Sequence, residues 1–235
     1  MSAYGWRARI GIILPANNVV TEPELAAMTA GRGVTVHTTR LVVTGTGLDD
    51  LRAMAARTDE AIAELLVADV DVVVYGCMST SFVPPYDWET RFAAAVAERS
   101  AVPCVTASAA LVRALTVHGA RRVAVLSAYT GDTLAQLEPF LAAHGLDVVR
   151  SATLAVEDLQ AFGRIDAREL YAAARDLGAD GADALCIAGT DLPAMPVSAA
   201  LEADLGIPVV PANQAMLEAA YRALGIEPVP AEAAQ

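Results

Sequence analysis

Short apolar runs rich in valine and isoleucine alternate along this chain with longer stretches rich in alanine and leucine. The short runs predict β-strands over residues 10–14, 34–41, 70–75, 103–105, 123–126, 147–150, 184–187 and 209–210. The longer stretches place apolar residues at helical spacing and predict helices over residues 48–67, 107–118, 133–144, 166–177 and 213–224. Strands that alternate with helices are typical of βαβ units, so the pattern predicts an α/β fold with parallel sheets flanked by helices.

One segment of this pattern is repeated later in the chain. VPCVTASAALVRAL begins at Val102 and IPVVPANQAMLEAA begins at Ile207, and each combines a branched residue, a proline, a short strand and an Ala/Leu helix. The repeat predicts two pseudo-symmetric Rossmann-like halves, with the active site in the cleft between them at the carboxyl ends of their strands. We place the halves at residues 1–112 and 113–235, with the break near 105–117. We expect the last helix, at about 213–225, to pack back on the first half.

Composition limits the partners of the protein. The 235 residues include 16 basic and 28 acidic ones, a formal net charge of −12, and no basic run is present, so nucleic acid is not an expected partner. No segment reaches the roughly 18 consecutive apolar residues of a membrane span, and the N-terminal apolar run is too short for a signal peptide. We therefore expect a globular protein with no membrane segment.

Cysteine and histidine usage bears on the redox compartment and on metal binding. The three cysteines, Cys77, Cys104 and Cys186, form an odd and sparse set, which predicts reduced thiols and a cytoplasmic location. The three histidines are scattered, and none has metal-ligand spacing with a cysteine or a carboxylate, so we expect no metal ion. Assembly into a homo-oligomer is left open by these observations.

Polar residues follow four of the predicted strands: PANN after 10–14, GCMSTS after 70–75, SAYTGDT after 123–126 and AGTD after 184–187. Asn, Ser, Thr and Asp cap helices, so each motif alone is equally consistent with a structural role. Cys77 favours a catalytic interpretation, because it lies beyond its strand at a loop leading to a helix, where the helix N-terminus lowers the pKa of a thiol. Cys104 and Cys186 lie inside apolar strands and are expected to be inert core thiols.

Five segments in the same order give the chain a family resemblance. IGIILPANNVVTEPE, YGCMSTSF, ARRVAVLSAYT, FGRIDARELYAAARDLGADGADAL and IPVVPANQAMLEAAYRALGI resemble motifs of the maleate cis–trans isomerase and arylmalonate decarboxylase branch of the aspartate/glutamate racemase superfamily. The resemblance covers nearly the whole chain. It implies a cofactor-independent enzyme whose two halves enclose a small cleft and, in the isomerases and racemases, contribute one cysteine each.

The resemblance also implies roles for individual residues. Cys77 matches the catalytic cysteine of the first half, and Asn18 matches the asparagine that holds a substrate carboxylate. Ser79 and Tyr129 match donors of the carboxylate-binding pocket. The predicted substrate-binding set is completed by their neighbours and by the second-half strand end: Thr80, Thr130, Gly189 and Thr190.

The chain departs from the family pattern at the second cysteine. Gly189 stands where the family usually has that cysteine, and Cys186 lies three residues earlier, inside the predicted strand. In the arylmalonate decarboxylase pattern of this family the arrangement is the opposite, with glycine in the first half and cysteine in the second. The segment VEDLQA also lacks the asparagine that helps maleate isomerases bind the second carboxylate, and Met78 stands where a threonine is common.

The candidate residues suit chemistry at a carbon next to a carboxylate. Neutral hydrogen-bond donors stabilise an enediolate-like charge without a salt bridge that would fix the ground state. Cys77 can add to an activated double bond as a thiolate and later be eliminated, or it can protonate an enediolate as a thiol. The sequence therefore predicts an enzyme acting through Cys77 on a small carboxylic or dicarboxylic acid, foremost a maleate-isomerase-like cis–trans isomerase. The alternatives are a single-cysteine decarboxylase or racemase and a catalytically silent carboxylate-binding homologue.

Overall fold

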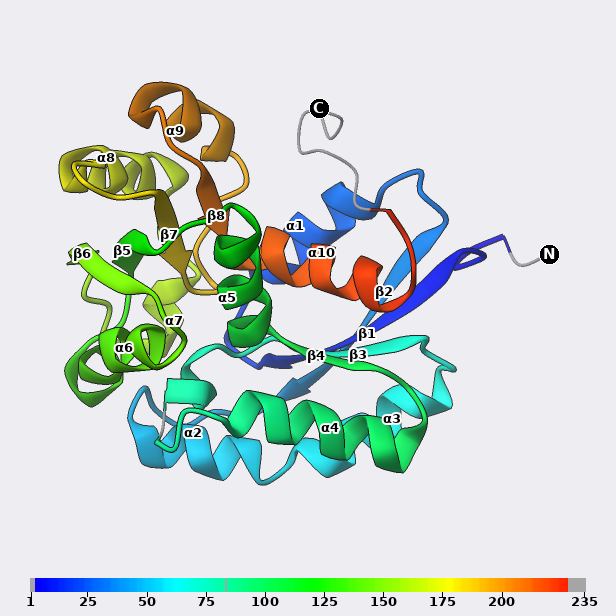
Figure 1. The fold of residues 1–235 in the computed structure, drawn as a ribbon. Helices are drawn as coiled ribbons and strands as arrows, with labels where there is room; N and C mark the ends of the chain where they lie inside the picture. The colour runs from blue at the N-terminus through cyan, green and yellow to red at the C-terminus, as the bar shows by residue number, and fades with distance from the viewer. Residues whose placement is uncertain (1–2, 83, 228–235) are drawn as a thin grey trace.

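Two four-stranded parallel sheets form the centre of the computed structural model, which describes residues 3–82 and 84–227. In the first sheet the order is β2-β1-β3-β4, from β1 (Ala8–Pro15), β2 (Val34–Leu41), β3 (Val72–Tyr75) and β4 (Cys104–Thr106). In the second the order is β6-β5-β7-β8, from β5 (Arg122–Ser127), β6 (Asp147–Thr153), β7 (Ala184–Ala188) and β8 (Val209–Pro211). The two orders correspond strand for strand, which confirms the predicted α/β fold of two similar halves (Figure 1).

Helices cover both faces of each sheet (Figure 1). The first half contains α1 (Thr21–Thr29), α2 (Leu48–Ala55), α3 (Thr58–Val67), the 3₁₀ helix η1 (Ser79–Phe82), α4 (Trp88–Ser100) and α5 (Ala107–Val117). The second contains α6 (Gly131–Ala143), α7 (Leu159–Phe162), α8 (Ala167–Leu177), α9 (Ser198–Leu205) and α10 (Ala212–Ala223).

One apolar core is shared by the two halves. Alternate strand residues, such as Ile12 and Val74 in the first sheet and Val125 and Cys186 in the second, pack with α5, α6 and α10. The opposite face of the first sheet packs on α2, α3 and α4, and that of the second on α8 and α9. Helix α10 contacts α5, α1 and β4, so this helix lies against elements of the first half. The division at residue 112 falls inside α5 and stays a prediction.

Strand register makes the two inner strand ends equivalent. The fifth residues of the two repeated stretches are Thr106 in β4 and Pro211 in β8. Thr106 pairs with the residue two before Cys77, and Pro211 pairs with the residue two before Gly189. Cys77 and Gly189 therefore occupy corresponding positions just beyond the carboxyl ends of β3 and β7.

All eight predicted strands are confirmed with small shifts of their ends, but one predicted helix is wrong. Residues 48–67 form two helices, α2 and α3, separated at Ala56 and Arg57. The Oγ1 of Thr58 donates a hydrogen bond to the carbonyl of Ala55 at 2.8 Å, so a side chain satisfies part of the last turn of α2.

Four α-helices, α1, α4, α7 and α9, were not predicted. In α1 the buried positions include Thr21, Glu24 and Thr29, so polar residues occupy places where a periodic pattern requires apolar ones. In α9 the buried positions are Ser198 and Leu201, and most of the remaining residues are small or acidic. Helices of this kind carry too few large apolar residues for periodicity to reveal them.

Candidate active site

Cys77 lies between the end of β3 and the start of η1, and its side chain is only 5% exposed. Its Sγ is 3.5 Å from the Oγ of Ser79 and accepts a hydrogen bond from the Oγ1 of Thr80, also at 3.5 Å. The hydroxyl of Tyr75 lies 2.9 Å from Thr80 Oγ1. Because the single proton of Thr80 points to the sulfur, Tyr75 donates to Thr80, and the chain of hydrogen bonds ends at the thiol.

The expectation that a helix N-terminus lowers the pKa of Cys77 is wrong for this structure. Burial raises the pKa of the thiol above its ordinary value of 9.0, hydrogen bonds from Ser79 and Thr80 lower it, and the negative charge of Asp191 raises it. The element that follows is a 3₁₀ helix of 4 residues, too short to supply the dipole of a long α-helix. Cys77 is therefore a thiol at neutral pH and needs a base to become a nucleophilic thiolate.

A small cavity lies beside the thiol, and residues from both halves line it. About 50 Å³ admits the centre of a water-sized sphere. The first half contributes the ends of β1 and β3 and the segment 43–46, and the second half contributes Tyr129, α6, α7 and the segment after β7. Two hydrogen bonds join these walls, from Thr133 Oγ1 to the carbonyl of Thr46 at 2.8 Å and from Asn17 Nδ2 to the carbonyl of Leu159 at 3.0 Å. Contacts between the halves thus hold the two sides of the cavity together.

The cavity brings together half of the predicted site residues. Those that line it are Cys77, Ser79, Tyr129 and Thr190. The others, Asn18, Thr80, Thr130 and Gly189, lie next to lining residues but do not line it themselves. Asn17 and Asp191, which the sequence did not single out, also line the cavity.

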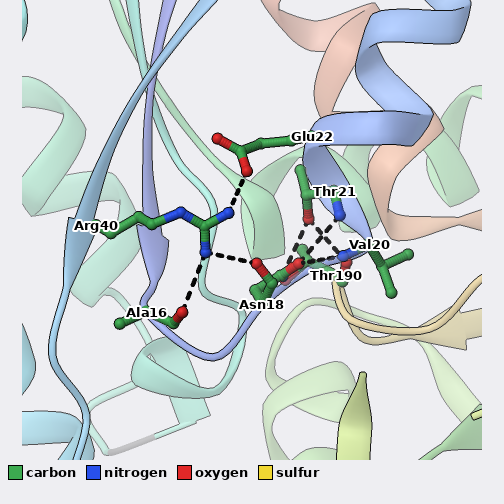
Figure 2. A network of polar contacts seen from close by, with 7 residues as sticks. All are labelled: Ala16, Asn18, Val20, Thr21, Glu22, Arg40 and Thr190. Atoms are coloured by element: carbon green, nitrogen blue, oxygen red, sulfur yellow. Dashed lines mark hydrogen bonds and ion pairs between the residues drawn. The ribbon is translucent and has the colours of Figure 1, made fainter. Parts of the chain in front are cut away.

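Asn18 joins the two halves instead of lining the cavity (Figure 2). Its Oδ1 accepts hydrogen bonds from the backbone amides of Val20 and Thr21 at 3.0 Å, which orders the start of α1. Its Nδ2 donates to Thr190 Oγ1 at 3.2 Å, and the Thr190 hydroxyl donates to the carbonyl of Gly76 at 2.9 Å. Asn18 thus helps to position the strand end that carries the cysteine. Its contact with a substrate carboxylate stays a prediction.

The loop between β1 and α1 is also held from β2. Arg40 donates hydrogen bonds to the carbonyls of Ala16 and Asn18, at 3.1 and 2.7 Å, and forms an ion pair with Glu22 (Figure 2). These contacts fix the backbone of the segment that carries both asparagines.

A buried carboxyl group holds the segment that follows β7 in the second half. Glu24 accepts hydrogen bonds from Asn213 Nδ2 at 2.7 Å and from the amide of Met195 at 3.0 Å. Asn213 also donates to the carbonyl of Thr190 at 3.0 Å. Burial raises the pKa of Glu24, although these hydrogen bonds lower it. The contacts tie α1 and α10 to the segment after β7, which carries Thr190 and Asp191.

Tyr129 supplies a neutral hydroxyl to the cavity. Burial raises its pKa well above the ordinary value of 10.0, and the charges of Asp191 and Cys77 raise it further. Its ring contacts Phe82 edge to face, with the centroids 5.4 Å apart. The phenol therefore stays protonated over the physiological range and can donate a hydrogen bond to a carboxylate.

Asp191 is the functional candidate that sequence reasoning missed. It lies two residues after Gly189, as Ser79 lies two residues after Cys77. Burial raises its pKa to about 6, and a hydrogen bond from its own backbone amide lowers it. The signal available in the sequence was the repeat, which places residue 191 at the position of Ser79 in the first half.

The structure also bears on metal binding and on membrane insertion. Within residues 3–82 and 84–227, no three His, Cys, Asp or Glu side chains are grouped so that they could hold a metal ion. None of the helices in those ranges is long and apolar enough to cross a bilayer. Cofactor independence and the cellular location stay predictions.

The fold and the cavity define an α/β protein of two equivalent halves with a buried cysteine between them. Residues 10–235 match the family model of arylmalonate decarboxylase, and the chain belongs to this family. It is 30% identical to a maleate isomerase of Pseudomonas putida, with 94% of this chain and 93% of the relative covered. It is 31% identical to the maleate isomerase of Nocardia farcinica (93% and 90%) and 28% identical to the arylmalonate decarboxylase of Bordetella bronchiseptica (91% and 86%).

Solved structures of the same family superpose over most of the chain. One is a Cys-to-Ser mutant of the Nocardia farcinica maleate cis–trans isomerase with a covalently bound succinylcysteine intermediate (TM-score 0.89, 28% identity, 93% of each chain). Another is a liganded arylmalonate decarboxylase with one Gly-to-Cys and one Cys-to-Ser substitution (TM-score 0.85, 25% identity, 93% of each chain). These relatives support a cysteine-dependent enzyme, an isomerase or a decarboxylase.

Proposed function

We propose that the protein is a cis–trans isomerase of a small unsaturated dicarboxylic acid, similar to the maleate isomerases, with Cys77 as its nucleophile. The observation that carries the proposal is the placement of Cys77, the one of the three cysteines that lines the cavity between the halves. Four maleate isomerases that are 25–31% identical over nearly their whole length support it.

The cavity offers what such a reaction needs. The Cys77 thiolate adds to one carbon of the double bond, and the electron pair moves to the neighbouring carbon, next to a carboxylate. The hydroxyls of Ser79 and Tyr129 can donate hydrogen bonds to the enediolate oxygens as the charge develops. Rotation about the new single bond and elimination of the thiolate then give the other isomer. The adduct is of the kind named for the Nocardia farcinica structure, a succinylcysteine.

Neutral donors must hold the substrate carboxylates in this site. The residues that line the cavity include no lysine, arginine or histidine among those described. Binding therefore depends on hydroxyl, amide and backbone donors, which suits a charge that moves during the reaction.

Proton NMR of the protein with maleate and 2-substituted maleates tests the proposal. We expect conversion to the trans isomer, and an adduct of the acid on the Cys77 peptide after acid quench. Cys104→Ala is the matched control, because Cys104 lies in β4 and does not line the cavity. Absence of isomerisation across the series would contradict the proposal.

A second function is favoured by the protonation state of the cysteine. Because burial raises its pKa, Cys77 is suited to give a proton to one face of an enediolate, and Gly189 leaves the other face without a thiol. A single-cysteine decarboxylase or racemase would then release carbon dioxide from disubstituted malonates, or exchange the α-hydrogen of an acid in D₂O. Binding of these acids without turnover would instead identify a catalytically silent homologue.

We propose further that the small acid is the sole ligand the reaction needs and that the protein acts in the cytoplasm. The three cysteines are free, in agreement with a reducing compartment. Turnover that persists after exhaustive dialysis against a chelator would support the cofactor-free reaction, and restoration by an added metal or nucleotide would contradict it. Size-exclusion chromatography will decide whether a homo-oligomer forms.

A further inference from the structure

The space beside Gly189 is already occupied by a carboxyl group. A Cβ atom at residue 189 would lie 3.1 Å from Oδ1 of Asp191 and 3.1 Å from the side chain of Leu192. Gly189 is the position equivalent to Cys77, and there the family usually has its second cysteine. The carboxyl group of Asp191 therefore stands where a second-half side chain would project.

Asp191 also shares the cavity with Cys77. Both residues line it, one from each half. The negative charge of Asp191 helps to raise the pKa of the Cys77 thiol and that of the Tyr129 phenol. Asp191 is partly buried, and none of the described cations forms an ion pair that offsets this burial. A carboxyl group without a cation partner, next to a buried thiol that needs a base, is placed for proton transfer.

We propose that Asp191 is the second catalytic residue of this enzyme, the acid and base that replaces the missing cysteine of the second half. The proposal rests on the proposed function, because it assigns a role within the same reaction.

The step balances with one proton. Asp191, as a carboxylate, takes the proton of the Cys77 thiol, directly or through a water, and the thiolate forms a C–S bond to one carbon of the double bond. The π electron pair moves to the neighbouring carbon, and Asp191 gives the proton to that carbon. The adduct is a saturated thioether, and Asp191 is a carboxylate again.

The reverse sequence releases the product. After rotation about the new single bond, Asp191 removes the proton from carbon, the electron pair re-forms the double bond, and the C–S bond breaks. The thiolate then recovers the proton from Asp191. No oxidant, reductant or further reactant is needed.

This role gives the reaction a defined pH dependence. The titratable groups that line the cavity, among the described residues, are Cys77, Tyr129 and Asp191. The pKa of the thiol and that of the phenol are raised, whereas that of Asp191 is about 6, so Asp191 is the group that titrates just below neutrality. Below about pH 6 it is protonated and cannot accept the thiol proton, so kcat/KM falls as the pH decreases.

The test compares Asp191→Asn with Asp180→Asn, whose carboxyl side chain is 95% exposed. With an acid that the wild type isomerises, kcat of Asp191→Asn is expected to be about 10²- to 10⁴-fold lower. The decrease of kcat/KM below about pH 6 is expected to disappear in this variant. Asp180→Asn is expected to retain both. Turnover of Asp191→Asn within about threefold of the wild type, or an unchanged acid limb, would overturn the proposal.

A second measurement needs no substrate and separates failure of this proposal from failure of the proposed function. The rate of Cys77 alkylation by iodoacetamide is followed against pH by peptide mass spectrometry. Because the charge of Asp191 raises the pKa of Cys77, the alkylation profile of Asp191→Asn is expected to move to lower pH. A wild type that turns over none of the acids contradicts the proposed function, whereas an unchanged alkylation profile contradicts the pairing of Asp191 with Cys77.

Discussion

Cys77 and Gly189 follow corresponding strands in the two halves, yet the two strand ends present different groups to the cavity. In the first half the thiol is followed by Ser79, whose hydroxyl lies 3.5 Å from the sulfur. In the second half the glycine is followed at the same offset by Asp191, whose carboxyl group fills the space beside it. The two strand ends thus have the same backbone arrangement, while the side chains at positions 77 and 79, and at 189 and 191, determine the chemistry of each half.

The two ends are also packed differently one residue earlier. A Cβ atom at Gly76 would lie 2.6 Å from Cδ2 of Leu14 and 3.1 Å from the carbonyl of Ile13, so any larger residue before the cysteine would displace its neighbours in β1. The equivalent residue before Gly189 is Ala188, which is fully buried with its methyl group in place. The first strand end is therefore fixed by close packing against β1.

The largest expected effect separates the two ends by activity. Cys77→Ala is expected to reduce kcat by about 10³-fold or more, because it removes the covalent or proton-transferring group. The fold is expected to persist, since the change removes a single side-chain atom, Sγ, from a site beside a cavity. Steady-state rates and a thermal melt by circular dichroism check both statements.

Cys186 provides the control in the second half. It is a fully buried thiol inside β7 and faces the shared core, away from the lining of the cavity. Cys186→Ala is expected to retain turnover and to lose about 1–2 kcal/mol of stability from the void that it leaves. Loss of activity in Cys186→Ala with activity retained in Cys77→Ala would show that the catalytic cysteine lies in the second half and would contradict the assignment of Cys77.

The strands and the repeat were predictable because strands buried in a parallel sheet have unbroken apolar sequences. Val72 to Val74 and Leu185 to Ile187 each form such a run, and both lie where predicted. The helices at the junction were less predictable, since α1 buries Glu24 and Thr21 in contacts with the second half. Contacts that form between distant segments leave no periodic trace in the sequence.

The site shows the same limit. Cys77, Ser79, Tyr129 and Thr190 were predicted from their places after strands, and all line the cavity. The pKa of Cys77 was not predictable, because it depends on burial by segments such as 43–46 that are remote in sequence. Asp191 was missed for a related reason: a carboxyl after a strand is an ordinary turn residue until its surroundings are known.

The next effect compares the two glycines by stability. Gly76→Ala is expected to cost about 2–3 kcal/mol, because the new methyl group meets the buried side chain of Leu14 and the backbone of Ile13. Gly189→Ala is expected to cost about 1 kcal/mol, since its contacts at 3.1 Å are with the side chains of Asp191 and Leu192, which can move. Urea unfolding of both variants measures the difference, and equal costs would show that the two ends are packed alike.

A smaller effect concerns the hydrogen bonds that join the two ends. Thr190→Val keeps the shape of the side chain but leaves the carbonyl of Gly76 without its donor at 2.9 Å. We expect a loss of about 1–2 kcal/mol in stability and about tenfold in kcat, because the strand end before the cysteine is less well held. Thr116→Val is the control, since its hydroxyl bonds a carbonyl of its own helix at an exposed position. Equal effects in the two variants would show that the hydrogen bond from Thr190 to Gly76 does not help to position the strand end that carries Cys77.

The smallest expected effect is the dependence of stability on pH in Asp191→Asn. The folded-state pKa of Asp191 is raised from 3.8 to about 6 by burial, so ionisation of this group costs the folded protein more than the unfolded chain. Its contribution to stability is therefore complete below about pH 4 and is lost as the pH rises through about 6. Asparagine does not ionise, so the variant escapes this loss.

Relative to the wild type, Asp191→Asn is consequently expected to gain about 1 kcal/mol between pH 4.5 and pH 7.5, less than the full shift implies because Asp191 is only partly buried. Urea unfolding of both proteins at the two pH values gives the quantity as a difference of differences. The raised pKa of Glu24 acts in the same direction in both proteins and cancels. A difference that stays constant with pH would show that the carboxyl group ionises as freely in the folded protein as in the unfolded chain, and the second strand end would then offer the cavity an ordinary surface carboxylate.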